Sequence, residues 1–219
     1  MNCRRCFHLA LICVCWLSAN AIAFGQAGNS PSPSCEDHPK DMKRLKILVA
    51  YQSKYGSTKQ YAEWIQEDVK GDLVNLKTDG LPPLAGYDII VLGGYIRTGE
   101  NVIAPLIRDH WDGLKTKKVI LFTTSGTPPH HPNIRIIYEK SFSEDIRKEI
   151  EYFPLPGRIS MKNLSFFDKR LITVGKMLER DEALKEEMGK DVDGIKRENL
   201  LPLVEYLKEI KHSLTDGCD

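Results

Sequence analysis

The feature that most constrains the fold of this chain is an apolar segment that runs directly into a turn rich in hydroxyl groups. Residues 47–52 have the composition of a buried β-strand, and residues 53–58 form a turn with the sequence SKYGST. Apolar side chains then recur at Tyr61, Ala62, Ile65 and Val69, the spacing of one buried helical face. The pattern predicts a strand, a tight turn and a helix over residues 58–69, which together open a βαβ unit.

The turn has the chemistry of an anion site. Backbone N–H groups of residues 56–59 would lack partners at the start of a helix, where the helix dipole is positive. The hydroxyl groups of Ser53, Ser57 and Thr58 add further donors. The Gly-Lys-Ser/Thr of a triphosphate-binding loop and the spaced glycines of a dinucleotide fingerprint are both absent from the sequence. A monophosphate is therefore the predicted ligand of this turn.

The rest of the chain continues the alternation of strands and helices. Further strands are predicted at residues 73–77, 88–93, 119–123 and 155–159, and further helices at residues 104–114, 138–150 and 200–214. Apolar strands separated by helices indicate a parallel sheet covered on both faces. We expect an α/β fold of three layers, with a doubly wound, five-stranded parallel sheet and a long insertion before the last helix.

The N-terminal residues differ from the rest. Basic residues followed by an apolar run predict a signal peptide over residues 1–27, with a membrane anchor as the alternative. Arg4-Arg5-Cys6-Phe7 resembles a twin-arginine signal, while an ordinary leader stays equally open. Residues 28–45 are expected to be a flexible linker and residues 46–215 the domain. The predicted location is exported, either periplasmic or extracellular.

Removal of this leader would leave two cysteines, Cys35 and Cys218, near the two ends of the remaining chain. An exported compartment permits a disulfide between them, and two free thiols are the alternative. The formal net charge of +1 gives no electrostatic case for nucleic acid as a partner. No metal site is predicted, because His130 and His131 have no third ligand at suitable spacing.

In a doubly wound sheet, ligands bind at the carboxyl ends of the strands, where the strand order reverses. Three loops are expected to reach that edge: residues 53–58, residues 93–101 and residues 124–131. Glycines in the second loop allow close approach of the backbone to a planar ligand, and Tyr95 offers a ring for stacking or for packing at the strand end.

With these loops placed, the chain resembles the flavodoxin-like FMN-binding proteins. In that family the first loop holds the phosphate of FMN and the next two enclose its ring. The phosphate motif Thr/Ser-x-Thr-Gly-x-Thr stands here with Tyr55 at its central hydroxyl position. The resemblance implies that the cofactor is FMN and that its binding residues are Ser53, Lys54, Tyr55, Gly56, Ser57, Thr58, Gly94, Tyr95, Ile96, Arg97, Thr98, Gly99, Thr124, Ser125 and Gly126.

A narrower resemblance lies downstream. The segment from Gly157-Arg158-Ile159 to Phe166-Phe167-Asp168 and beyond is similar to the insertion of the menaquinone-dependent protoporphyrinogen dehydrogenases. Residues 161–178 alternate apolar and basic side chains, which suits a hydrophobic acid, a quinone or a peripheral membrane contact, or else a helix packed on the sheet with solvated lysines.

Three functions remain open, and the catalytic residues are unknown at this stage. The first is an exported FMN-dependent oxidoreductase with a quinone or another small-molecule acceptor. The second is a flavodoxin-type electron carrier with a redox protein partner. The third is a binding module without flavin. Because Arg97 has only Glu100 near it in its loop, we expect a flavin potential above that of an electron carrier with acidic loops.

Overall fold

The computed structural model describes residues 45–216, and its centre is a parallel sheet of five strands. The strands follow the order β2-β1-β3-β5-β6. Their bounds are β1 Ile47–Tyr51, β2 Asp72–Asn75, β3 Ile89–Arg97, β5 Lys118–Ser125 and β6 Ile150–Pro156. The chain moves from β1 outward to β2 and then returns past β1 to β3, so the order reverses between β1 and β3. The predicted fold class is confirmed.

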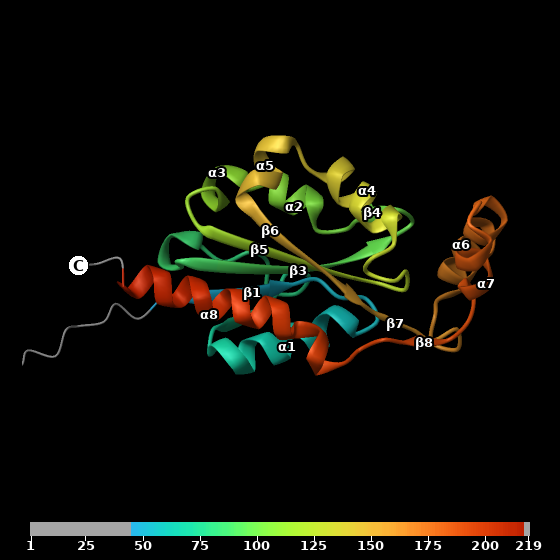
Figure 1. Ribbon diagram of the computed structural model, residues 1–219, viewed down its shortest axis with the longest axis horizontal. Helices are drawn as coiled ribbons and strands as arrows, with labels where there is room; N and C mark the ends of the chain where they lie inside the picture. Colours follow the sequence, from blue (N-terminus) through green and yellow to red (C-terminus); the bar gives the residue numbers. More distant parts are fainter. Residues whose placement is uncertain (1–44, 217–219) are drawn as a thin grey trace, which may run out of the picture. The chain divides into compact units, whose positions relative to one another are not determined.

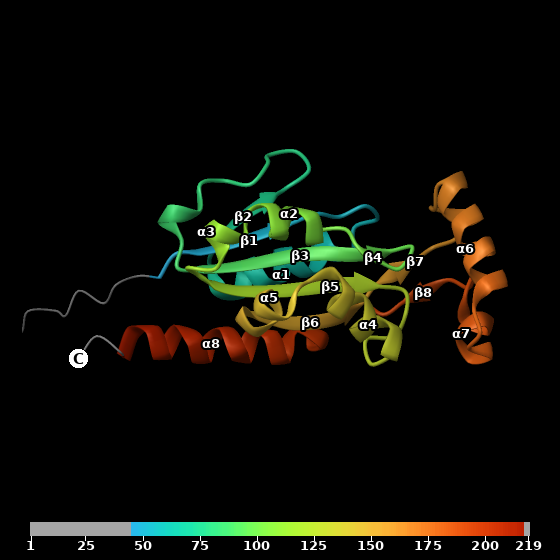
Figure 2. The same cartoon turned by 90° about the horizontal axis from the view of Figure 1, so that it is seen from above.

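Helices cover both faces of this sheet (Figure 1). One face carries α1 and α8, and the other carries α2, α3 and α5, with α4 toward the carboxyl ends of the strands (Figure 2). Their bounds are α1 Ser57–Val69, α2 Ala104–Asp109, α3 Trp111–Leu114, α4 Pro132–Ser141, α5 Glu144–Glu149 and α8 Leu201–Asp216, with short 3-10 helices at η1 Leu84–Gly86 and η2 Arg197–Leu200. Among the described residues, no helix has both the length and the apolarity that crossing a membrane requires.

Alternation along the strands divides the core between the two faces. In β1, Ile47 and Val49 pack under α1 and α8 together with Ile65 and Leu207. Leu48 and Ala50 point to the opposite layer. Successive side chains of a strand leave opposite faces, so a strand in the middle of three layers must be apolar throughout. This is why residues 47–51 read as one continuous apolar run.

The predicted boundaries fail around the last strand. The predicted helix over residues 138–150 is wrong: α4 ends before Phe142, whose backbone is extended, and α5 starts anew after Ser143. The predicted strand at residues 155–159 instead begins at Ile150. The spacing of Phe142, Ile146 and Ile150 suits one helical face, and all three are buried. They lie, however, just after α4, in α5 and at the start of β6, respectively. Two prolines in β6 are tolerated because β6 is an edge strand.

The long insertion starts and ends in a two-stranded ribbon. Strand β7 Arg158–Ile159 pairs antiparallel with β8 Val192–Asp193, and between them lie α6 Phe166–Leu178 and α7 Glu182–Glu187. The Tyr61 hydroxyl of α1 donates to the carbonyl of Pro156 at 3.0 Å, and the Asn199 amide donates to that hydroxyl at 2.9 Å. The base of the insertion is therefore held to the α1 layer. Helix α6 lies beyond the carboxyl ends of the central strands (Figures 1 and 2).

Candidate functional site

The three predicted loops come together at the carboxyl ends of β1, β3 and β5. They line a cavity of about 590 Å³, which falls within the usual range of roughly 300–1,000 Å³ for small-molecule sites. Of the fifteen residues predicted to bind a cofactor, thirteen line this cavity; Gly56 and Gly94 do not. The position agrees with the expectation that ligands bind where the strand order reverses.

The first loop presents free donors at the start of α1. Gly56 precedes the helix with a φ of 93°, a left-handed conformation that favours glycine. The first intrahelical bond runs from the Gln60 N–H to the Gly56 carbonyl, so the N–H groups of Ser57, Thr58 and Lys59 have no acceptor within α1. The Ser53 hydroxyl oxygen accepts from the Gly56 N–H at 3.1 Å, which leaves its own hydrogen available to a ligand.

The two other hydroxyl residues of this loop differ in what they can offer. Ser57 Oγ accepts from the Arg158 N–H at 3.0 Å and keeps its hydrogen for a ligand. Thr58 Oγ1 is buried, donates to the Gly94 carbonyl at 3.2 Å and lies 2.9 Å from Thr124 Oγ1. The Thr58 hydroxyl is thereby engaged with two protein groups. We conclude that Thr58 ties the three loops to one another, whereas Ser53 and Ser57 remain free to donate to an anion.

Most of the loop expected at residues 93–101 is a tight hairpin of two strands. Strand β3 continues to Arg97 and pairs with β4 Glu100–Asn101. The turn between them has φ values of 51° at Thr98 and 75° at Gly99, the two positive values that a type I′ turn requires. Tyr95 and Arg97 are half-buried and line the cavity. Tyr95 and Arg97 therefore extend into the cavity from a paired strand, which fixes their backbone positions.

The insertion closes on the site through one carboxylate. Asp168, near the start of α6, is only 7% exposed. Its Oδ1 accepts from the Arg97 guanidinium at 2.7 and 3.0 Å, and its Oδ2 accepts from Lys54 Nζ at 2.5 Å and from the Tyr55 hydroxyl. The Tyr55 hydroxyl oxygen also accepts from the Ser165 N–H at 3.1 Å. Tyr55, which departs from the family motif, therefore docks the insertion onto the first loop.

These contacts set the ionisation of the group. Burial alone would raise the pKa of the Asp168 carboxyl, but the hydrogen bonds that it accepts outweigh burial and lower its pKa. The bond to Asp168 raises the pKa of Lys54 and that of Arg97. The Asp168 carboxylate stays ionised, and together with the cations Lys54 and Arg97 it forms a group with a net charge of one positive unit. The expectation that Arg97 has only Glu100 as a nearby acid is wrong, because Asp168 pairs with it; the flavin potential itself stays a prediction.

The residues that sequence reasoning missed come mainly from the insertion and from α4. They add apolar surface to the polar side formed by the loops. The Ile159 side chain closes tightly on Gly126, where a Cβ atom would collide with Ile159 Cδ1. The other apolar lining residues are Ile134, Ile137, Leu164, Leu171, Ile172, Val174, Leu178, Met188 and Val192. The alternation of apolar and basic residues over 161–178 was the only sequence signal for this wall.

Of the two loop histidines, His131 serves the structure of α4. His131 precedes the helix, and its Nδ1 accepts from the Asn133 N–H at 3.2 Å. Its Nε2 lies 3.3 Å from an Asp181 carboxylate oxygen. Within residues 45–216, no group of three or more His, Cys, Asp or Glu side chains is arranged to hold a metal ion. Cys35 and Cys218, the predicted disulfide pair, lie outside the described residues, as do the predicted signal peptide and nearly all of the linker.

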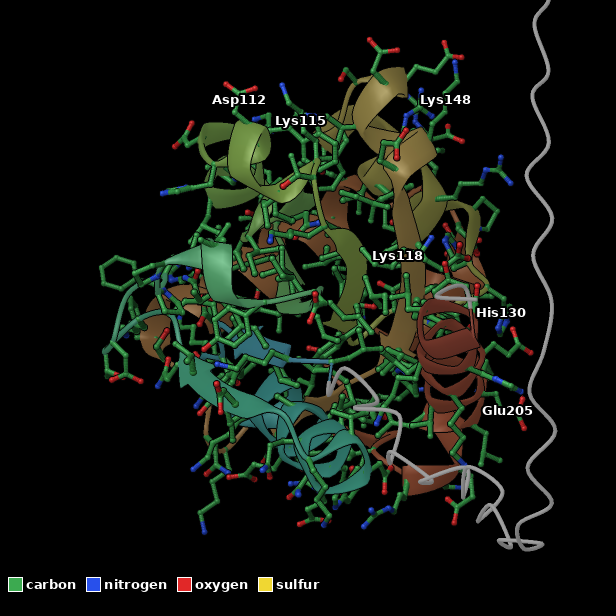
Figure 3. All side chains as sticks on the ribbon, turned by 90° about the vertical axis from the view of Figure 1, so that its left-hand side faces the viewer. Asp112, Lys115, Lys118, His130, Lys148 and Glu205 are labelled. Atoms are coloured by element: carbon green, nitrogen blue, oxygen red, sulfur yellow. The ribbon has the colours of Figure 1, made fainter. Side chains whose placement is uncertain are left out.

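A second hollow lies at the opposite edge of the sheet. It has a volume of about 790 Å³ and is lined by residues 81–85, 109, 110, 112, 113, 116 and 117, which precede β3 and β5. The charged side chains at that end point outward, as Asp112, Lys115 and Lys148 do in Figure 3. Asp112 pairs with Lys115, three residues away, and is 94% exposed. Two segments line this hollow, whereas the first cavity brings together three loops, α4 and the insertion.

Comparison with known proteins places the chain in a family. The sequence profile of the flavodoxin domain matches residues 48–184, well over half of the chain. The chain belongs to the flavodoxin-domain family. The match bears out the predicted flavodoxin-like fold and the predicted cofactor, FMN. It spans all three loops of the site together with α6.

Several solved structures are similar to this flavodoxin-domain protein. Oxidised flavodoxin 2 from Bacillus cereus is 24% identical, with 52% of this chain and 85% of that chain covered and a TM-score of 0.37. A flavoprotein from Lactobacillus acidophilus in complex with FMN is 16% identical, with 52% and 93% covered and a TM-score of 0.37. A flavodoxin from the domain Archaea is 17% identical, with 61% and 99% covered and a TM-score of 0.38. No curated protein matches the chain.

Proposed function

We propose that this flavodoxin-domain protein is an FMN-dependent oxidoreductase that acts outside the cytoplasm on a small apolar acceptor such as a quinone. The observation that carries the proposal is the cavity itself. One side offers free N–H and O–H donors at a helix start, and the other side is an apolar wall contributed by the insertion.

The donor set fits the phosphate of FMN. The N–H groups at the start of α1 and the hydroxyl groups of Ser53 and Ser57 would hold it, and Lys54 adds positive charge at the same loop. The side chain of Tyr95, at the end of β3, would lie against the ring. Bound FMN supplies the redox chemistry, and this chain supplies binding, orientation and charge.

The apolar wall favours an enzyme over a pure electron carrier. Electron transfer between proteins needs an accessible flavin edge, whereas the wall of α6 and α4 adds a surface on which an apolar molecule can bind. Leu171 and Ile137 belong to this wall. Within the family, the likeness of the insertion to that of menaquinone-dependent protoporphyrinogen dehydrogenases supports the quinone proposal. Export rests on the sequence of residues 1–27.

The first experiment tests FMN binding and its phosphate contacts. The purified chain is titrated with FMN and with riboflavin, which lacks the phosphate. We expect FMN to bind about 10- to 100-fold more tightly, since each hydrogen bond to a charged group contributes roughly 1.5–3 kcal/mol. Ser57→Ala should weaken FMN but not riboflavin, while Ser141→Ala, which removes a hydroxyl in α4 that donates to Ile137, serves as the control.

Two further measurements separate the remaining alternatives. A protein that takes up no FMN supports the flavin-free binding module and removes both redox functions. If FMN binds, reoxidation of the reduced protein is measured with a soluble quinone and with a redox protein acceptor. Faster and saturable reoxidation by the quinone supports the enzyme, and reoxidation only by the protein acceptor supports the electron carrier. Sequencing the N-terminus of the protein from its native compartment tests export.

A further inference from the structure

The outer face of α6 is apolar and exposed. Among the side chains whose exposure the structure describes, six of the eleven exposed large apolar ones belong to this one helix. Met177 is 77% exposed, Phe167 75% and Leu178 75%. Such a concentration on a single helix marks an interaction surface rather than ordinary scatter. The six side chains are Phe166, Phe167, Leu171, Val174, Met177 and Leu178. Three of them, Leu171, Val174 and Leu178, also line the cavity, so Phe166, Phe167 and Met177 define the outer face.

Packing within the domain does not account for this face. Asp168, Ile172 and Gly175, at helical spacing, line the cavity and define the inner stripe of α6. Phe166, Phe167 and Met177 are absent from the cavity lining and from both core clusters. Their exposure therefore serves neither the core nor the cofactor cavity.

Along α6 itself the charges are almost all positive, and the acids Glu179 and Glu182 follow only after the helix ends. Residues 161–178 contain four basic side chains, Lys162, Lys169, Arg170 and Lys176, and one acid, Asp168. Asp168 is buried and already paired with two cations. The Arg170 guanidinium lies over the Phe166 ring, 5.4 Å from its centroid. The outer face thus combines aromatic and aliphatic side chains with positive charge, since Asp168 is the one acid among residues 161–178.

This combination fits an anionic lipid surface better than a protein. Lysines are depleted at the centres of protein interfaces, whereas helices that lie in a membrane interface carry Phe and Leu on one side and Lys and Arg beside them. Basic stems can lie along the apolar zone while their charged heads reach lipid phosphates. Helix α6 also lies beyond the ends of the strands, where a flat surface can approach it (Figure 2).

We propose that α6 docks this protein onto the surface of an anionic lipid bilayer, with Phe166, Phe167 and Met177 entering the interface and Arg170 and Lys176 contacting lipid phosphates. The contact is peripheral. It is independent of FMN binding, because none of these side chains lines the cavity.

Hydroxyl-radical footprinting of the full chain tests the proposal at the residues concerned. Vesicles of phosphatidylcholine, with and without about a quarter phosphatidylglycerol, are added to the protein. With anionic vesicles, we expect the oxidation rates of Phe166, Phe167 and Met177 to fall about fivefold or more, while Leu201 in α8 keeps its rate. If the chain binds these vesicles and the α6 side chains stay as reactive as Leu201, another segment makes the contact and the proposal fails.

Matched variants separate the apolar and ionic contributions. Phe166→Ser with Phe167→Ser should abolish the protection of Met177 and lower vesicle binding about tenfold, by the loss of buried aromatic area. Leu201→Ser with Leu214→Ser, which removes two exposed apolar side chains of α8, should change neither. Equal losses in both variants would contradict the proposal.

The charge variant is Arg170→Glu with Lys176→Glu. It should lower binding to anionic vesicles about tenfold or more, as expected for removing two basic residues near the surface. Lys140→Glu with Lys208→Glu changes the net charge equally at two other exposed positions. If both charge variants bind alike, the contact follows overall charge and the assignment to α6 is wrong. The same footprinting is repeated with an acidic protein in place of vesicles. If that protein lowers the oxidation rates of the α6 side chains as vesicles do, the partner is a protein and the lipid assignment is overturned.

Discussion

The two edges of the sheet carry hollows of similar size and very different chemistry. The hollow at the amino ends of the strands is the larger, about 790 Å³ against about 590 Å³. Two of its polar lining groups bond to near neighbours in the chain, Asp112 to Lys115 and Thr116 to Gly113, while Lys117 donates to the Ala85 carbonyl across 32 positions at the long distance of 3.5 Å. At the carboxyl ends, Asp168 joins residues 71 to 114 positions away, and Thr58 joins Thr124 across 66 positions. Convergence of distant polar groups, rather than volume, distinguishes the candidate site.

The difference has a thermodynamic meaning. Exposed ion pairs between neighbouring residues contribute about 0–1 kcal/mol, because water screens them and because holding both side chains in one geometry costs conformational entropy. Buried polar groups must be paired, and removing one partner leaves the others unsatisfied. Stability at the carboxyl edge should therefore depend on single side chains, while the amino edge should tolerate the same substitutions.

The largest difference is expected for the two aspartates. Asp168→Asn removes the charge that holds Lys54 and Arg97, so we expect the opening free energy of α6 to fall by about 2 kcal/mol, or amide exchange there to rise about 30-fold. Lys54 is 32% exposed and Arg97 40%, so solvent limits the effect. Asp112→Asn should change exchange in α3 by less than about twofold. Equal responses at the two sites would remove the distinction between the edges.

A smaller effect is expected when one hydroxyl is replaced by a methyl group. Thr58→Val leaves the Gly94 carbonyl without its buried donor and should lower the free energy of unfolding by about 1–2 kcal/mol in urea titrations. Thr116→Val, at the amino edge, removes an exposed bond to Gly113 and should cost less than about 0.5 kcal/mol. If Thr58→Val instead leaves stability intact and weakens FMN alone, its hydroxyl binds phosphate, as first expected from the motif.

Two tyrosines allow the same comparison at a single hydroxyl. Tyr55→Phe removes the donor to Asp168 and the acceptor of the Ser165 N–H, so α6 should lose about 1 kcal/mol of opening free energy. Tyr87→Phe removes a donor to Asp72 near the amino edge and should cost about half as much. Hydrogen exchange across α6 and β2 measures both. If Tyr55→Phe leaves the opening free energy of α6 unchanged, Lys54 and Arg97 alone hold the insertion.

What the sequence predicted and what it missed follow the same division. Most strands and loops were predicted correctly because apolar runs and glycine-rich turns are local signals. Once the loops were located, the first loop, Tyr95 and Arg97 could be predicted as cavity residues. Asp168 was not predicted as part of the site, because its partners are distant in sequence and nothing local distinguishes it from a solvated acid. Phe142 shows the opposite failure, since its spacing suited a helix that the chain interrupts at Ser143.

The smallest expected effect concerns acid. Because the pKa of Asp168 in the folded protein lies below the ordinary value of about 3.9, its contribution is complete above that value and is lost as the pH falls toward the folded pKa. The opening free energy of α6, relative to Asp168→Asn, should stay constant from pH 7 to pH 5 and fall by about 0.7 kcal/mol at pH 3.5. Amide exchange, corrected for intrinsic rates at each pH, measures this.

The control is Asp112→Asn, which should show a smaller change in α3 over the same range, since solvent weakens the exposed pair of Asp112 and Lys115 at every pH. A difference between wild type and Asp168→Asn that grows on acidification would mean that the carboxyl is protonated more readily in the folded protein than in the unfolded chain, and that burial, rather than Lys54 and Arg97, governs this edge of the sheet.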